Sequence, residues 1–271
     1  MNTIPRLAVW LLTLLATSVL NAQQADPNAY VPLHKKSDWT VANAHSHNDY
    51  QHKKKSFTAA YAAGFGSIEV DIFLSHDSLF VGHEPEDIQL HRMLRPLYLD
   101  PLAANIRRHG GYPYADTSRR LQLLVDIKTD SIATLDALLQ HLRSYPDIIR
   151  CRGLSIVITG NRPPVDAWPN YPSFIYFDGS IGQTYPPALL PKIAMISGDL
   201  EDFIKWDGKS TLSSRQAGTL SAIIEGIHRQ GKKVRFWDAP DFKNSWLQLI
   251  GAGVDWINTD HIERLAGFLG N

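Results

Sequence analysis

One stretch of the sequence, Gly66-Ser67-Ile68-Glu69-Val70-Asp71-Ile72-Phe73-Leu74, has the pattern of a β-strand with two different faces. Its apolar residues Ile68, Val70 and Ile72 share one face because side chains alternate along a strand. Glu69 and Asp71 share the other face. Two carboxylates on the inner face of a buried strand repel each other and lose hydration unless a cation lies between them. A divalent metal held by both explains the pair, and a solvent-facing polar strand is the alternative.

Further short apolar segments alternate with helical patterns along the chain. The expected strands cover residues 41–44, 67–73, 121–127, 154–159, 173–177, 192–196, 233–237 and 254–258. Helices are expected over residues 56–63, 132–142, 215–230, 246–251 and 261–269. Eight β/α units in about 230 residues are typical of an α/β protein with the (β/α)8 TIM-barrel fold. A doubly wound open sheet is the competing architecture, but it normally has fewer strands and a glycine-rich phosphate loop, which this sequence lacks.

The barrel is expected to be a single domain over residues 39–271, with a small insertion after its second strand. Residues 84–120 are too long for a simple connection and are expected to lie over the barrel mouth. Residues 1–22 have the pattern of a signal peptide, since Arg6 precedes an apolar run and Ala22 offers a small residue for cleavage. Residues 23–38 form an irregular lead-in. An uncleaved membrane anchor is the alternative, although the run is short for a membrane span.

The composition of the chain limits the classes of binding partner and the cellular location that we expect. Lys plus Arg and Asp plus Glu number 27 each, so no basic stripe indicates a nucleic-acid partner. Cleavage would leave a nearly neutral chain without an integral membrane segment, in the periplasm or outside the cell. The single cysteine, Cys151, permits no intrachain disulfide. We expect a monomer.

Polar residues follow several expected strands at the end where barrel enzymes have their active sites. The first strand runs into His45-Ser46-His47-Asn48-Asp49-Tyr50, and His83 follows the second. The third carries Asp126 and Lys128, which a structural ion pair would also explain. Carboxylates with an amide oxygen suit one hard divalent cation, Mg²⁺ or Ca²⁺. Two histidines can act as base and acid, and a lysine stabilises negative charge, so this set is suited to phosphodiester cleavage.

These motifs resemble the phospholipase-C-like phosphodiesterase superfamily. Ser46-His47-Asn48-Asp49-Tyr50 is similar to the Ser-His-Asn-x-Tyr motif of eukaryotic phosphoinositide phospholipases C. Glu69-x-Asp71 followed by His83 is similar to a motif of glycerophosphodiester phosphodiesterases, and Asp126-Ile127-Lys128-Thr129 resembles a strand of sphingomyelinase D. The pattern His-Ser-His-Asn-Asp-Tyr with a late Trp is closest to the bacterial and fungal branch named for altered inheritance of mitochondria.

The resemblance implies a metal-dependent phosphodiesterase that cleaves a glycerophosphodiester or phospholipid-type phosphodiester by His/His acid–base catalysis. Its partner would be a small-molecule phosphodiester or a lipid headgroup. The implied roles are catalysis by His47 and His83, metal binding by Asn48, Glu69, Asp71 and Asp126, phosphate contact by Lys128, and substrate contact by Trp237. The His-Arg-Gly motif of glycerophosphodiesterases is absent. His45 remains a rival for the first catalytic histidine, because it follows an Ala as the histidine of that motif does. Asn48 fits the resemblance only if His47 is the first catalytic histidine, so His47 is favoured.

Two other functions fit parts of this pattern. An amidohydrolase-like barrel, or one like the polymerase and histidinol phosphatases, would use His45 and His47 directly as metal ligands. Such barrels need further histidines from their middle strands, and residues 143–227 contain none. A non-catalytic barrel that binds a lipid or sugar phosphate is the other alternative. Against it, every position of the expected catalytic set is filled by a chemically competent residue.

Overall fold

The computed structural model describes residues 34–51 and 56–270. The strands are β1 (Ala44–Ser46), β2 (Ser67–Ser75), β3 (Ser78–Val81), β4 (Leu121–Ile127), β5 (Leu154–Gly160), β6 (Ile175–Ser180), β7 (Ile193–Asp199), β8 (Lys233–Trp237) and β9 (Ile257–Thr259). Eight of these nine strands are neighbours in the order β8-β7-β6-β5-β4-β2-β1-β9, and the pairs along this path are parallel. A bridge between Arg235 and Trp256 brings the two ends together. The predicted (β/α)8 TIM barrel is confirmed.

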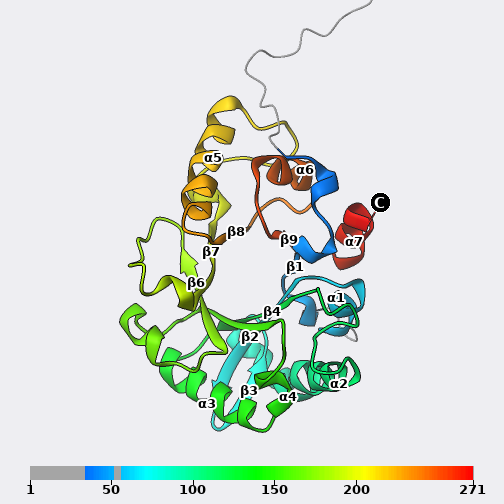
Figure 1. Ribbon diagram of the computed structural model, residues 1–271, viewed down its shortest axis with the longest axis vertical. Coiled ribbons are helices and arrows are strands. Elements are labelled where there is room, and N and C mark those ends of the chain that lie inside the picture. Colours follow the sequence, from blue (N-terminus) through cyan, green and yellow to red (C-terminus); the bar gives the residue numbers. More distant parts are fainter. Residues whose placement is uncertain (1–33, 52–55, 271) are drawn as a thin grey trace, which may run out of the picture.

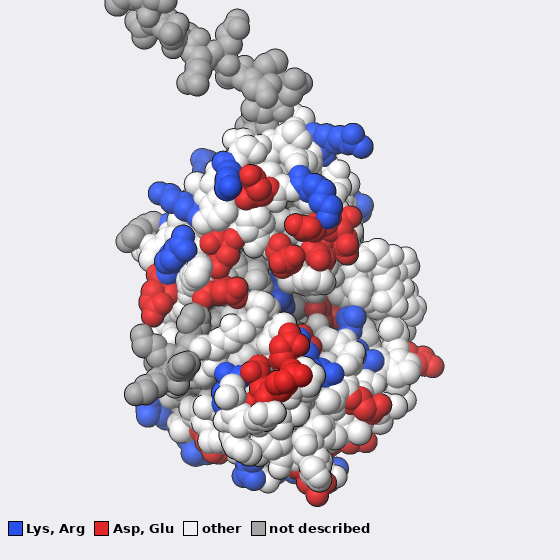
Figure 2. All heavy atoms as spheres, turned by 180° about the vertical axis from the view of Figure 1, so that it is seen from behind, with Lys and Arg blue, Asp and Glu red and all other residues white. Residues whose placement is uncertain are grey.

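The helices lie outside this ring of strands (Figure 1). They are α1 (Thr58–Ala63), α2 (Asp100–Arg108), α3 (Ser131–Arg143), α4 (Pro146–Ile149), α5 (Ser214–His228), α6 (Lys243–Ala252) and α7 (Ile262–Gly270). Among the described residues, none of the helices has both the length and the apolarity that a membrane span requires. The expected signal peptide and residues 23–33 of the lead-in lie outside the described residues. From the opposite side, the molecule is hollowed near its middle, with Asp and Glu side chains on both sides of the hollow (Figure 2).

An insertion follows β2, as predicted. β3 folds back antiparallel on β2, and the 3-10 helix η4 (Pro85–Leu90) comes next. The later part of the segment forms α2, which packs against α4 in the outer layer. The cavity at the barrel mouth is lined by His83, just before this segment, and by none of residues 84–120, which were expected to lie over the mouth.

The first strand begins later than predicted. Residues 41–43 form the 3-10 helix η2 (Val41–Asn43), and β1 starts at Ala44. The Thr40 hydroxyl accepts a hydrogen bond from the Ala42 N–H at 3.2 Å, and the Asn43 side chain accepts one from the Thr40 N–H at 3.1 Å. Such local bonds offer the backbone an alternative to strand pairing. His45 consequently lies within the strand, whereas His47 follows its end.

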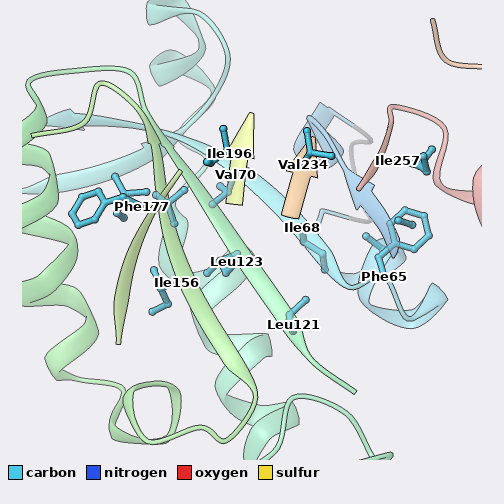
Figure 3. Packing of buried hydrophobic residues seen from close by; sticks show 14 of the residues in the cluster. Phe65, Ile68, Val70, Leu121, Leu123, Ile156, Phe177, Ile196, Val234 and Ile257 are labelled. Atoms are coloured by element: carbon cyan, nitrogen blue, oxygen red, sulfur yellow. The ribbon is translucent and has the colours of Figure 1, made fainter. Parts of the chain in front are cut away.

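The hydrophobic core has two parts. The larger part joins the outer face of the barrel to the helices and includes Ile68 and Val70 of β2 (Figure 3). A smaller cluster contains Leu124, Val157, Met195 and Trp256. Leu124 shares its strand face with Asp126, because the two residues are two positions apart. The smaller cluster thus fills the barrel interior below the polar residues at its mouth.

Candidate active site

Three carboxylates meet inside the barrel. The pairing of β2 with β4 places Asp71 directly beside Asp126. One carboxylate oxygen from each of Glu69, Asp71 and Asp126 lies within 4.8 Å of the others. Glu69 is 3% exposed and Asp71 is 1% exposed, so the alternative of a solvent-facing polar strand is excluded.

Lys128 places a positive charge between two of these groups. Its Nζ lies 2.9 Å from Oδ2 of Asp71 and 2.8 Å from Oδ2 of Asp126. Burial alone would lower the pKa of Lys128, but the two carboxylates outweigh burial and raise it. The lysine is therefore an ammonium ion, and a cation already stands beside part of the acidic cluster.

The remaining oxygens of the cluster fit a divalent cation. Burial raises the pKa of both Asp71 and Asp126, and the charge of Glu69 raises both further; the pKa of Asp71 reaches about 6. In each aspartate, Oδ1 is buried and has no hydrogen-bond partner among the described residues. Buried polar atoms are rarely left in this state. Even with Arg235, whose guanidinium lies 2.9 Å from Glu69, two positive side chains do not balance three carboxylates. Oxygen ligands of this kind are those that Mg²⁺ and Ca²⁺ prefer.

Gly160 leaves room for the Asp126 carboxylate. A Cβ atom at this position, the end of β5, would lie 1.9 Å from Oδ1 of Asp126. The backbone of Gly160 also has φ of +68°, which side chains other than glycine rarely adopt. The local sequence Thr159-Gly160 therefore supports the position of a carboxylate on the neighbouring strand.

Glu69 is held by two partners. Its Oε2 lies 2.7 Å from Nε2 of His45 and 2.9 Å from Nη2 of Arg235, a residue of β8 that is 3% exposed. Burial alone would raise the pKa of Glu69, but Arg235 and the bond to His45 outweigh burial and lower it. Glu69 is therefore ionised, and its position in the cluster is fixed from two sides.

The two histidines of the first motif have different surroundings. His45 is fully buried, with Nδ1 at 2.7 Å from the Ser67 hydroxyl and Nε2 bound to Glu69. Burial and the charge of Arg235 lower the pKa of His45 to about 3. His45 is thus a neutral residue with both ring nitrogens engaged.

His47 and His83 both line the central cavity. Nδ1 of His47 lies 2.7 Å from Oδ1 of Asp260. Burial alone would lower the pKa of His47, but the bond to Asp260 and the charge of Glu69 outweigh burial and raise it. Nδ1 of His83 lies 2.8 Å from Oε1 of Glu84. The geometry favours His47 over His45 as the first histidine that can reach a substrate.

Asn48 lies close to the cluster through Tyr50. The Tyr50 hydroxyl donates a hydrogen bond of 2.7 Å to Oδ1 of Asn48. Burial and the nearby charge of Asp71 raise the pKa of Tyr50, so the phenol keeps its proton. Tyr50 thus occupies one acceptor site of the Asn48 amide, and Asn48 is not among the residues that line the cavity, so metal binding by Asn48 stays a prediction.

The cavity at the barrel mouth has a volume of about 660 Å³. Of the predicted site residues, those that line it are His47, Glu69, His83, Asp126, Lys128 and Trp237. Arg235 and Asp260 also line it, and sequence reasoning missed both. The sequence does contain one indication of Arg235 as a site residue, because it is a charged residue between the apolar Val234 and Phe236 of an expected strand.

A parallel barrel with paired histidines and an acidic cluster at one mouth has the architecture of phospholipase-C-like phosphodiesterases. Residues 35–162 match the model of the AIM6-like phosphodiesterase domain, and residues 233–263 match that of the glycerophosphoryl diester phosphodiesterase family. The chain is 27% identical to the altered inheritance of mitochondria protein 6 homolog of Arthroderma benhamiae, over 83% of this chain and 82% of that one. The predicted relationship to this superfamily and its AIM6-like branch is confirmed.

Solved structures show the same fold. A Ca²⁺-dependent phosphatidylinositol-specific phospholipase C from Streptomyces antibioticus has a TM-score of 0.54 at 14% identity, covering 86% of this chain and 98% of that one. A glycerophosphodiester phosphodiesterase from Parabacteroides distasonis has a TM-score of 0.51 at 16% identity, covering 84% and 97%. The family matches support a phosphodiesterase-type hydrolase, rather than an amidohydrolase with histidine ligands.

Proposed function

We propose that this protein is an exported, divalent-cation-dependent phosphodiesterase that cleaves a small phosphodiester with a pair of histidines. One observation carries the proposal: a single cavity is lined by Lys128, by the two histidines His47 and His83, and by Glu69 and Asp126 of the acidic cluster. A purely structural ion-pair network would not need two histidines on the cavity wall or buried carboxylate oxygens without partners.

Glu69, Asp71 and Asp126, with Asn48 beside them, are the residues that would hold the cation. A bound divalent cation supplies positive charge for the phosphoryl oxygens and makes an oxygen nucleophile easier to deprotonate. Lys128 contributes a second positive charge from the same side of the cavity, where it can contact the phosphate. The donor set suits Mg²⁺ and Ca²⁺ alike.

The histidines are oriented by carboxylates. Asp260 accepts the Nδ1–H of His47, which leaves Nε2 to take a proton from a nucleophile. Glu84 holds Nδ1 of His83 in the same manner. Cleavage requires one imidazole to accept the proton of the attacking oxygen while the other donates a proton to the departing alkoxide. Both side chains line the cavity, so both can reach one bound phosphodiester.

The cavity is suited to a small phosphodiester or a lipid headgroup. Trp237 is 42% exposed at the end of β8 and offers an aromatic surface for the alcohol part of the substrate. Glycerophosphodiesters and phospholipid headgroups fit within this volume, whereas the neutral overall charge gives no support for a nucleic-acid substrate.

The test is a hydrolysis assay of purified protein on glycerophosphodiesters, phosphoinositides, sphingomyelin and lysophospholipids. We expect cleavage of one class, its loss with a chelator, and its return with Mg²⁺ or Ca²⁺. The His47→Ala/His83→Ala double variant serves as the control for contaminating enzymes. Absence of cleavage of every class by cation-loaded wild type, or equal cleavage by the double variant, would contradict the proposal.

Export is the second part of the proposal and rests on the sequence of residues 1–22, outside the described residues. N-terminal sequencing of the protein from the periplasm or medium should find a start near Gln23. Material that begins at Met1 in those fractions would rule out cleavage.

A further inference from the structure

We propose that Arg235 is a further catalytic residue, one that binds a phosphoryl oxygen of the substrate directly; this inference rests on the proposed function. Arg235 lies in the middle of β8, is only 3% exposed, and lines the same cavity as Lys128 and His47. Arg235 lies within residues 233–263, which match the glycerophosphoryl diester phosphodiesterase family, but it belongs to none of the sequence motifs quoted above.

The guanidinium of Arg235 is fixed in position by the protein, but not all of its N–H donors are engaged. Its Nε donates to Oδ1 of Asn258 at 3.0 Å, and its Nη2 lies 2.9 Å from Oε2 of Glu69. A guanidinium has five N–H donors in a planar fork. Among the described residues, Nη1 has no hydrogen-bond or ion-pair partner. One edge of the group is therefore fixed by protein, and Nη1 remains available for an anion in the cavity.

Stability does not explain a buried arginine here. Removing an arginine and a glutamate from water costs free energy that their mutual attraction often fails to recover. Deeper in the barrel, Leu124, Val157 and Met195 form an apolar cluster. An ion pair at the mouth, on the wall of the cavity, is instead the arrangement expected of a group that meets a charged ligand.

The position also complements Lys128. β8 and β4 are separated by three strands in the barrel order, so Arg235 and Lys128 approach the cavity from different parts of the wall. The His-Arg-Gly motif is absent, since Ser46 follows His45 and Asn48 follows His47. Arg235 brings a guanidinium to this cavity from the other end of the sequence. A planar fork can bind two phosphoryl oxygens at once, which an ammonium cannot do.

Arg235 exchanges no proton in the reaction. The oxygen nucleophile, water or a hydroxyl of the substrate, forms a bond to phosphorus and passes its proton to one histidine. The bond from phosphorus to the leaving oxygen breaks, and the second histidine protonates that oxygen. Negative charge grows on the non-bridging oxygens between these events, and the fixed guanidinium stabilises it.

The experiment compares Arg235→Lys and Arg235→Gln with wild type, using Arg229→Lys as a matched control on the exposed surface. Three quantities are measured: kcat/KM on the best substrate, the affinity of cation-loaded protein for inorganic phosphate, and the affinity for the cation alone. For Arg235→Gln we expect kcat/KM to fall about 10²–10³-fold, the scale of one lost charge-stabilising donor. For Arg235→Lys, kcat/KM and phosphate affinity should each fall at least about tenfold, because the fork is lost while the charge remains.

The cation affinity of Arg235→Lys should stay within about threefold of wild type, because Glu69 keeps a positive neighbour. Wild-type phosphate affinity and turnover in Arg235→Lys would overturn the inference. A loss of cation affinity without a loss of phosphate affinity would also overturn it and make Arg235 a positioning residue for Glu69. If Arg235→Gln does not fold, Arg235→Lys decides alone. If wild type cleaves no phosphodiester, the proposed function fails, and the phosphate affinities still test Arg235.

Discussion

Two parts of the cavity contain buried aspartates in contrasting surroundings. On β2 and β4, Asp71 and Asp126 lie beside each other and near Glu69. On β6, Asp178 is as buried as Asp71, but its Oδ2 accepts hydrogen bonds from the Ser197 hydroxyl at 2.5 Å and the Thr159 hydroxyl at 3.0 Å. Burial raises the pKa of Asp178 to about 6, as it does for Asp71. Depth alone therefore does not distinguish the two sites; their neighbours do.

This contrast indicates which carboxylates are suited to hold a cation. Asp178 also has a buried Oδ1 without a hydrogen-bond partner among the described residues, but two hydroxyls stabilise its Oδ2, and the charges of Arg235 and Arg162 lower its pKa against burial. Carboxylates that face one another repel, and each protonates more readily unless a cation joins them. The acidic cluster is thus suited to a divalent ion, whereas Asp178 is suited to organising the polar wall of the cavity.

The largest contrast should come from Asp71→Asn and its matched control Asp178→Asn. Asp71→Asn should abolish measurable cation binding and lower kcat by at least about 10³-fold, since a metal ion contributes several kcal/mol of transition-state stabilisation. Without cation, the same variant should be more stable than wild type by about 1–3 kcal/mol, because a repelled buried charge is removed. Calorimetric titration with Mg²⁺ or Ca²⁺ and thermal unfolding measure both effects. Asp178→Asn should retain cation binding. An equal loss of cation affinity in the two variants would contradict the distinction between the acidic cluster and Asp178.

The histidine pair should give the next largest effect. His47→Ala and His83→Ala should each lower kcat by about 10²–10⁴-fold, the usual scale for a positioned acid or base. KM should change little, because Lys128 still contacts the phosphate. The two losses should not add in the double variant, since the residues act as a unit. Steady-state kinetics test this, and a single variant with wild-type kcat would remove that histidine from the mechanism.

Much of the barrel could be predicted because its strands are short apolar segments with clear periodicity. The predicted bounds of β4 and β8 agree with the structure to the residue. β1 was placed too early because the side chains of Thr40 and Asn43 bond locally, an effect that hydrophobic pattern does not report. The hydrophobic pattern predicts where a strand can form, but it does not predict where hydrogen bonds of nearby side chains make the strand begin.

The site could be predicted only where its residues share a strand or a motif. Glu69 and Asp71 are two positions apart, so alternation alone placed them together. The partner of His47 is Asp260, which is 213 positions away. The contact of Arg235 with Glu69 likewise depends on closure of the barrel, from β8 across to β2. Such pairings are set by three-dimensional packing, and no single segment of the sequence contains them.

Gly160 gives a smaller and more local test of the acidic cluster. Gly160→Ala should displace the Asp126 carboxylate, because the new Cβ would lie 1.9 Å from its Oδ1. We expect cation affinity to fall about 10–100-fold, the range found when the support of a metal ligand is lost. Gly231→Ala is a matched control, since Gly231 also has positive φ but no atom within 4 Å of an added Cβ. Unchanged cation affinity in Gly160→Ala would show that Asp126 does not contribute to the site.

The pH dependence should be the mildest effect. Below the pKa of Asp71, about 6, a proton competes with the cation, so apparent affinity should fall by up to about tenfold per pH unit. Cation-free protein should show the opposite trend in stability. The raised pKa means that the folded state binds more protons than the unfolded state, so this group lowers stability as pH rises from about 4 to 6. Titration calorimetry and unfolding at several pH values measure both, and a pH-independent affinity would contradict the assignment of Asp71.

The most direct test of the cation site is anomalous diffraction from crystals grown with Mn²⁺, an oxygen-preferring cation like Mg²⁺ and Ca²⁺. We expect one anomalous peak bounded by the carboxylates of Glu69, Asp71 and Asp126, with no peak beside Asp178. Two results would contradict the proposed cation site. One is a peak beside Asp178 instead, and the other is no peak at the acidic cluster at saturating Mn²⁺, with Lys128 as the sole cation beside the carboxylates.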